Sequence, residues 1–289
     1  MKQLSVRIIL IFIAIIYPLV ISGCGQKSKI LQIKGSDTMV NMAQSMVEEF
    51  MRENPEASVA ITGGGSGTGV AALISGTADI AQCSRDMTQH EIDLAKKRNV
   101  FPYEIPVAID GIAVVVSPKN PVSKLTIGQL SDIFSGKVTN WKDLGGPDRR
   151  IVALSRDRNS GTHIFFLEHV VKKGKKRSVD EFAKNVLMMP STQAIVEEVS
   201  VNQEAIGYIG LGYVSSRTKL VAVAKDTGQP YIIPTIKTSA SGLYPISRSL
   251  LFYTNGAPAG EVKNFIDFVL GEVGQKIVID TGFVPLHKK

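Results

Sequence analysis

Apolar residues along the first hundred or so positions follow two alternating spacings. Short apolar runs bounded by glycine or polar residues are typical of strands, and longer segments with apolar residues every three or four positions are typical of helices. The predicted strands cover 30–33, 57–62 and 79–83, and the predicted helices cover 39–52, 70–75 and 89–98. This alternation predicts an α/β sheet with helices on its faces.

A second α/β series follows after the β-branched run at 112–116. The predicted helices of this series cover 127–134, 161–172, 192–200, 261–271 and 274–280, and the predicted strands cover 151–154, 206–209, 220–223 and 250–253. The stretch from 224 to 249 shows no regular pattern. We therefore predict two α/β lobes, with the apolar runs at 112–116 and 250–253 as candidate strands that cross between them.

The N-terminus has the pattern of a secretory signal. Lys2 and Arg7 precede an apolar stretch over residues 8–21, which is short for a membrane-spanning helix, since such a helix needs about 20 residues. We interpret residues 1–23 as a signal peptide, and an uncleaved anchor helix is the alternative. Either interpretation places the folded body outside the cytoplasm and tethered to a membrane.

The end of this signal, Ile21-Ser22-Gly23-Cys24, resembles a bacterial lipobox, in which the cysteine is acylated and becomes the new N-terminus. Residues 24–29 would then form a short tether. The sequence contains two cysteines, Cys24 and Cys83. If Cys24 carries lipid, no internal disulfide is possible and a cysteine-rich zinc site is excluded.

The formal net charge is +7, so the summed field of the protein would attract anions or anionic lipid. The basic run at 172–177 has no interleaved aromatic residues, which argues against nucleic-acid binding.

Four predicted loop–helix junctions share one composition, namely small and hydroxyl-bearing residues directly before a helix. They are 35–38 (GSDT), 63–69 (GGGSGTG), 83–85 (CSR) and 156–162 (RDRNSGT). Free N–H groups at the start of a helix and nearby hydroxyl groups either cap the helix or donate to an anion. Two of these junctions also carry an arginine, whose fork of donors suits a tetrahedral oxyanion.

These motifs, together with 133–137 (IFSGK), Asn140-Trp141 and 282–286 (GFVPL), resemble the phosphate-binding lipoproteins of bacterial ABC-type phosphate uptake systems. The resemblance runs from about residue 30 to residue 286. It implies a two-lobed, hinged periplasmic-binding-protein fold of type II, with lobe 1 formed by 30–113 and 249–289 and lobe 2 by 114–248. It also implies capture of inorganic phosphate and its delivery to a membrane permease, by a monomer anchored to the cell membrane through Cys24.

The resemblance also implies the ligand groups. These are Thr38, the Met39 backbone amide, Ser66, Ser84, Arg85, Arg156, Ser160, Gly161 and Thr162. No catalytic residue, metal or cofactor is expected.

The third junction departs from some family members, which carry there an aspartate that accepts the proton of bound phosphate and so excludes sulfate. In this chain the corresponding turn ends in Arg85. Discrimination between the two anions needs an acceptor, and Asp110 is the first candidate because it precedes a predicted crossing strand. Asp37 and Asp157 are the next candidates.

Three other functions stay open from the sequence. The ligand could be sulfate, molybdate or another oxyanion, and a surface adhesion or sensing role could be an additional duty. An exported phosphoesterase would need a nucleophile with an activating base or a metal cluster, and the scattered Asp, Glu and His residues offer neither.

Overall fold

The computed structural model describes residues 30–286. The predicted signal peptide, the predicted lipidation site Cys24 and the predicted tether lie outside the described residues. Within them, no helix is long and apolar enough to cross a membrane.

The strands form one mixed nine-stranded sheet and one separate parallel pair. The order in the large sheet is β2-β1-β3-β11-β4-β8-β6-β7, with β9 beside β4, and β5 pairs with β10. The strands are β1 (Leu31–Gly35), β2 (Val59–Thr62), β3 (Ile80–Cys83), β4 (Pro102–Val116), β5 (Lys124–Thr126), β6 (Val152–Arg156), β7 (Leu187–Met189), β8 (Ala205–Gly210), β9 (Lys219–Leu220), β10 (Ala222–Ala224) and β11 (Ser247–Asn255).

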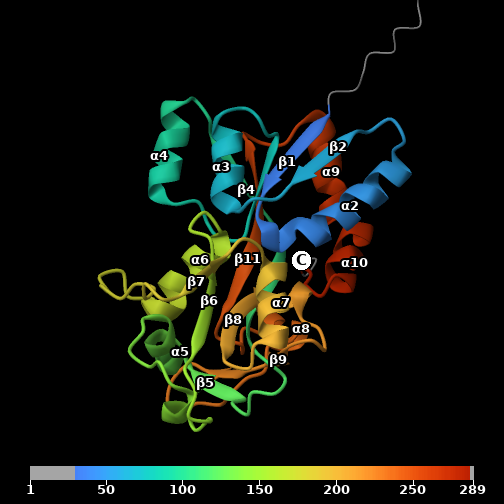
Figure 1. Ribbon diagram of the computed structural model, residues 1–289. Coiled ribbons are helices and arrows are strands. Elements are labelled where there is room, and N and C mark those ends of the chain that lie inside the picture. The colour runs from blue at the N-terminus through green and yellow to red at the C-terminus, as the bar shows by residue number, and fades with distance from the viewer. Residues whose placement is uncertain (1–29, 287–289) are drawn as a thin grey trace, which may run out of the picture.

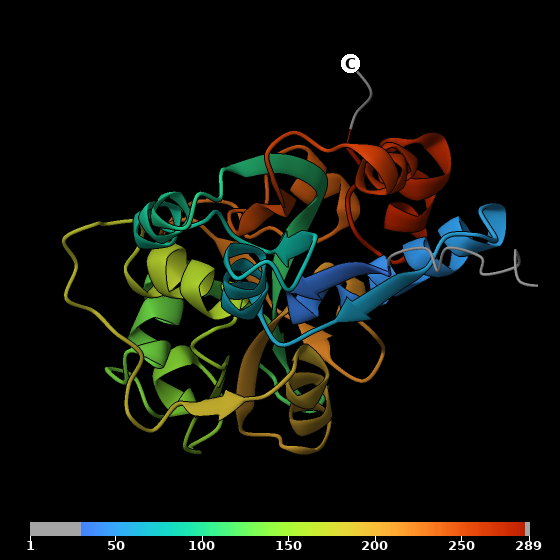
Figure 2. The ribbon, with the colours of Figure 1, turned by 90° about the horizontal axis from the view of Figure 1, so that it is seen from above.

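Helices cover both faces of the sheet (Figures 1 and 2). The α-helices are α2 (Val40–Glu53), α3 (Ser66–Ile74), α4 (Gln89–Lys97), α5 (Ile127–Phe134), α6 (Gly161–Phe166), α7 (Thr192–Val201), α8 (Ile236–Ala240), α9 (Gly260–Leu270) and α10 (Glu272–Asp280). The 3-10 turns are η2 (Asp37–Met39), η3 (Trp141–Leu144) and η5 (Leu211–Tyr213), and the π-helical turn η4 (Leu167–Val171) extends α6.

Two long antiparallel strands, β4 and β11, run through both halves of the molecule (Figure 1). The first part of β4 pairs with β11, and its last residues, Ile112–Val116, pair with β8. The part of β4 before residue 112 was not predicted, because Pro106, Asp110 and Gly111 interrupt the apolar pattern. Pro106 lies where the register with β11 shifts between Leu250 and Leu251, as expected for a proline that cannot donate to the ladder.

In the first lobe, alternate residues of the strands bury two different faces. Ile80 and Phe252 belong to a cluster with side chains of α2, α9 and α10, whereas Ala81 and Leu251 belong to a cluster with side chains of α3 and α4. Because both faces of the sheet are covered, the sequences of β3 and β11 contain nearly continuous apolar runs.

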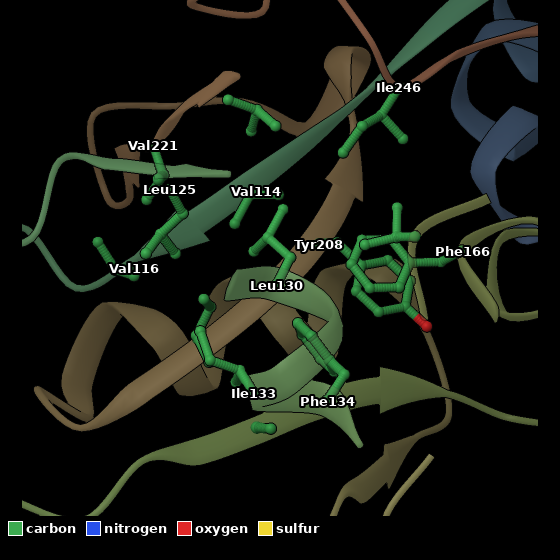
Figure 3. Close-up of a cluster of buried hydrophobic side chains, with 14 of the residues drawn as sticks. Val114, Val116, Leu125, Leu130, Ile133, Phe134, Phe166, Tyr208, Val221 and Ile246 are labelled. Atoms are coloured by element: carbon green, nitrogen blue, oxygen red, sulfur yellow. The ribbon is translucent and has the colours of Figure 1, made fainter. Parts of the chain in front are cut away.

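The second lobe repeats this arrangement. Val114 packs in a cluster with α5 and α6, and Val115 packs in a cluster with α7. In the larger cluster, Phe134 lies edge-on to Phe166 and to Tyr208, with ring centroids 4.9 and 5.5 Å apart (Figure 3). These separate cores confirm the predicted two-lobed α/β fold.

Local differences from the prediction are small. Helix α3 begins at Ser66 rather than at 70, so the glycine-rich stretch already forms its first turn. The stretch predicted as irregular, 224–249, contains α8 and the start of β11, and the short strands β5 and β7 were not predicted.

Candidate functional site

The predicted junction residues come from both lobes and meet between them. Thr38 and Met39 form the turn η2 after β1, Ser66 begins α3, and Ser84 follows β3 directly. Strands β1 and β3 are parallel neighbours, so their carboxyl ends meet at one edge of the sheet. From the other lobe, β6 is followed by Ser160–Thr162 at the start of α6.

Hydroxyl groups from the two lobes are in direct contact. The Oγ1 atoms of Thr38 and Thr162 lie 2.8 Å apart, and the Ser84 amide donates to Ser66 Oγ at 3.0 Å. A Cβ atom at Gly161 would lie 2.3 Å from Ser66 Oγ. Glycine is therefore required at 161 for this close approach of the lobes. We call Thr38, Ser66, Ser84 and Thr162 the hydroxyl cluster; each of them is buried, as is the neighbouring Gly161.

Asp110 lies beside this cluster, in the part of β4 that joins the two lobes. Its side chain is fully buried, and its Oδ1 atom accepts a hydrogen bond of 2.9 Å from the Leu211 amide. A Cβ atom at Gly210 would lie 2.8 Å from Thr38 Cγ2 and 3.2 Å from both carboxylate oxygens of Asp110. The Asp110 carboxylate and the Thr38 side chain therefore both lie against Gly210.

Arg248, at the start of β11, is a site residue that the sequence did not suggest. It faces Asp110 across the strand pair, and its Nη2 atom donates to Asp110 Oδ2 and to Thr162 Oγ1, each at 2.9 Å. One signal was available, since residues 248, 250 and 252 share one strand face and Leu250 and Phe252 are apolar. A charge on such a face indicates a paired buried group.

Burial raises the pKa of the Asp110 carboxyl above its ordinary value, while the Arg248 guanidinium and the Leu211 amide act in the opposite direction. Burial also lowers the pKa of Arg248, against the effect of Asp110. The two charges therefore depend on each other, and removal of either would leave the other uncompensated in a buried place.

Arg156 reaches the contact between the lobes rather than the hydroxyl cluster. Its Nη1 atom donates to Asp37 Oδ2 at 3.0 Å and to Thr192 Oγ1 at 2.8 Å. The amide of Thr192, at the start of α7, donates to the same Asp37 oxygen at 2.9 Å. Asp37 belongs to the first lobe and its partners to the second, so this set of bonds links the two.

Arg85 is turned toward helix α4 of its own lobe. Its terminal nitrogens donate to the two carboxylate oxygens of Glu91 at 2.8 and 2.7 Å. Glu91 also accepts from the Thr88 amide and completes the cap of α4. Of the predicted site residues, Arg85 and Arg156 are thus close to the hydroxyl cluster in sequence but bonded to carboxylates of the protein.

Ser160 caps α6, with its Oγ atom 3.5 Å from the His163 amide. Behind it, Ser155 Oγ contacts His163 Nδ1 at 2.9 Å and Tyr208 Oη at 2.6 Å. Burial, and secondarily the charge of Arg158, lowers the pKa of His163 to about 4. His163 is therefore neutral at physiological pH and adds no charge to the site.

A further contact closes the lobes beside the site. The Gly67 amide donates to the Asn159 carbonyl at 3.0 Å, and Asn159 Nδ2 donates to the Gly64 carbonyl at 2.8 Å. The glycine-rich stretch is thus covered by the loop that precedes α6. Among residues 30–286, no group of three or more His, Cys, Asp or Glu side chains could hold a metal ion.

Comparison with known proteins identifies the family. The PBP superfamily domain matches residues 22–273. The chain is 33% identical over 272 residues to the phosphate-binding protein PstS of Pseudomonas aeruginosa, covering 88% of this chain and 82% of that relative. The chain belongs to the PstS family. The family also includes the PstS protein of Borreliella burgdorferi, which is 30% identical over 290 residues, 99% of each protein.

Solved structures agree with this assignment. A phosphate ABC transporter substrate-binding protein of Clostridium perfringens, solved with bound phosphate, matches with a TM-score of 0.80 and 31% identity over 90% of this chain and 100% of that one. An ABC-type phosphate transport receptor of Vibrio cholerae matches with a TM-score of 0.71 and 32% identity over 89% and 100%. PstS-family members and these neighbours are named for binding and transport, which agrees with the expectation that this protein is not an enzyme.

Proposed function

We propose that this protein captures inorganic phosphate between its two lobes and delivers it to an ABC permease. The observation that carries the proposal is the meeting of buried hydroxyl groups from both lobes beside the Asp110–Arg248 pair. A buried oxyanion needs several donors to offset the loss of its hydration. The hydroxyl cluster and Arg248 supply such donors, and the names of the family members support phosphate as the ligand.

Closure of the lobes is the proposed mechanism of capture. The cross-lobe bonds of Asp37, Asn159 and Thr38 form only when the lobes are together. We place the boundaries within β4 and β11, at 113/114 and 248/249. Along β4, the apolar cluster of the first lobe includes Ala108 and that of the second lobe includes Ile112, which supports a division in this part of the strand.

We propose Asp110 as the group that accepts the proton of bound phosphate. Its Oδ1 atom accepts a single hydrogen bond, from the Leu211 amide, so a second lone pair is open to a donor. Sulfate has no proton to give at neutral pH, and would meet this carboxylate without a hydrogen bond between them. The same carboxylate would thus select phosphate over sulfate.

The remaining ligand groups are proposed from the resemblance alone. They are Met39, Arg85, Arg156 and Ser160. We further propose a monomer that is anchored outside the cytoplasm through a lipidated Cys24, because residues 1–24 have the pattern of a lipoprotein signal. Mass spectrometry of the protein extracted from membranes would test the lipid.

Calorimetric titration tests the function. A soluble form that begins at Gly25, stripped of bound anion, is titrated with phosphate and then with sulfate at neutral pH. We expect one phosphate per chain and no heat with sulfate. Absence of phosphate binding would refute the proposal, and equal binding of both anions would refute the selective role of Asp110.

The variant Asp110→Asn examines the acceptor separately. It keeps the shape of the side chain and removes its charge, so we expect weaker phosphate binding and a smaller preference for phosphate over sulfate. An Asp110→Asn protein with the preference of the wild type would show that another group accepts the proton.

A further inference from the structure

Residues 172–177 (KKGKKR) form a basic segment that takes no part in the proposed phosphate site. Five of its six residues carry a positive charge. The segment follows the π-helical turn η4 in the loop that leads to β7, and this loop projects outward from the second lobe (Figures 1 and 2). Residues 173–177 are exposed, so their side chains are open to a partner in solution.

Backbone hydrogen bonds give the basic segment a defined shape. The Gly174 amide donates to the Glu168 carbonyl at 2.8 Å, and the Ser178 amide donates to the Lys175 carbonyl at 2.9 Å. Lys173 and Gly174 both have positive φ angles, 54° and 70°. Successive turns therefore hold the segment to η4 while its side chains stay exposed.

Nearby acidic side chains neutralise only part of the charge of the basic segment. Lys172 pairs with Glu181 at 2.6 Å, and Asp180 pairs at 2.7 Å with Lys137, which lies outside the segment. Glu168 is the one other acid between residues 167 and 186. An excess of positive charge therefore stays on this surface. The cations of the segment that form no ion pair within residues 30–286 are Lys173, Lys175, Lys176 and Arg177.

Val179 adds an apolar group beside these charges. Its side chain is 92% exposed, the highest value among the large apolar residues within 30–286. Basic side chains with an exposed apolar neighbour suit the surface of an anionic membrane, where the charges meet phosphate groups and the apolar side chain reaches the boundary with the acyl chains. A single-stranded nucleic acid would instead need stacking aromatic side chains, and the basic segment contains none.

We propose that the basic segment binds the anionic headgroups of a phospholipid membrane. This inference rests on the proposed anchoring of the chain outside the cytoplasm. A lipid tether would hold the protein close to the membrane, where even a weak attraction acts at a high effective concentration. The contact would draw the second lobe toward the bilayer and so limit the orientations of the tethered protein.

The contact is expected to be weak by itself and sensitive to salt. Each basic residue close to an anionic membrane strengthens binding about fivefold. The attraction falls off within about 10 Å at an ionic strength of about 0.1 M. Removal of two charges from the basic segment should therefore weaken binding about 25-fold.

Vesicle sedimentation tests the inference. The chain from Gly25 onward, without lipid, contains every residue of the described fold and is mixed at low ionic strength with phosphatidylcholine vesicles, with or without phosphatidylglycerol. We expect binding only where phosphatidylglycerol is present, and release by added salt. In the double variant Lys175→Gln and Lys176→Gln, we expect the affinity for these vesicles to fall about 25-fold.

The matched control carries Lys96→Gln and Lys97→Gln. These are two adjacent exposed lysines in the last turn of α4, on the first lobe, so the net charge changes by the same amount. We expect the control to bind the vesicles within about twofold of the wild type, because these charges lie away from the proposed contact. Circular dichroism establishes that both double variants are folded.

Three results would overturn the inference. They are equal binding to vesicles with and without phosphatidylglycerol, absence of binding to both, and a control that loses as much affinity as the variant of the basic segment. A variant of the basic segment that binds vesicles like the wild type but associates with phosphate more slowly would also overturn it, because the segment would then attract free phosphate.

Failure of the proposed function gives different results. A wild type that does not bind phosphate would count against capture, and a protein from membranes without lipid on Cys24 would count against anchoring. Vesicle binding by the chain without lipid depends on neither.

Discussion

The bond set of Asp37 predicts how strongly one carboxylate stabilises the closed lobes. In Asp37→Asn the side chain keeps its shape and can still accept from the Thr192 amide, but the charge opposite Arg156 is lost. The side chain of Arg156 is 3% exposed and that of Asp37 is 22% exposed. The variant therefore leaves a buried cation with a weakened partner in the closed form only.

The size of the effect lies between two known limits. Removing one partner of a fully buried pair costs about 3–5 kcal/mol, and an exposed pair contributes about 0–1 kcal/mol. Because Asp37 is partly exposed, we expect the closed form to lose about 1–3 kcal/mol, which corresponds to an affinity about 5–150-fold weaker. A binding-competent form that is less populated lowers the apparent affinity in proportion.

Calorimetric titration with phosphate at low ionic strength measures this loss. Glu197→Gln is the matched control, since it removes one charge from the Arg217–Glu197 pair, whose side chains are about half exposed and lie in one lobe. We expect the control to bind like the wild type. An Asp37→Asn protein within about twofold of the wild type would refute the reasoning, because the pair would then contribute no more than an exposed one.

Two further predictions follow from contacts described above. Gly161→Ala would place a methyl group 2.3 Å from Ser66 Oγ, so we expect at least about tenfold weaker phosphate binding. Gly128→Ala is the control, because its added methyl group meets only an ordinary contact, and this variant should bind phosphate like the wild type. Glu91 has a pKa below its ordinary 4.5, because hydrogen bonds from Arg85 and Thr88 prevail over burial. Its contribution to stability is therefore complete above pH 4.5 and is lost as the pH falls through the lowered value. Urea unfolding should separate wild type from Glu91→Gln at pH 7, and the difference should shrink as the pH falls below 4.5; a difference that does not shrink would contradict this.

The fold and the hydroxyl cluster could be predicted because their signals are local. An apolar run of four or five residues indicates a buried strand, and Ser160 or Ser66 beside glycine indicates the start of a helix wherever it occurs. Asp110 was accessible for a similar reason, since it lies just before the apolar run at 112–116, which was predicted as a crossing strand.

The bonds of the arginines could not be predicted, because their partners are distant in the sequence. Arg156 meets Asp37 across 119 positions, and Arg248 meets Asp110 across 138. The beginning of β4 was missed for the same reason, since its pairing with β11 compensates for Pro106, Asp110 and Gly111, which interrupt the apolar pattern. Such features depend on strand pairing, which a local pattern does not contain.

The place of β11 in the sheet has a consequence for the order of folding. It lies between β3 and β4, so Phe252 pairs with Gln82 on one side and with Ile105 on the other. A chain that has been synthesised only to residue 246 would therefore have two unpaired strand edges in its first lobe and no strand to join them. Contacts of such long sequence separation form slowly. The first lobe is synthesised first but would be completed last. Its sheet would stay incomplete until almost the whole chain has been synthesised.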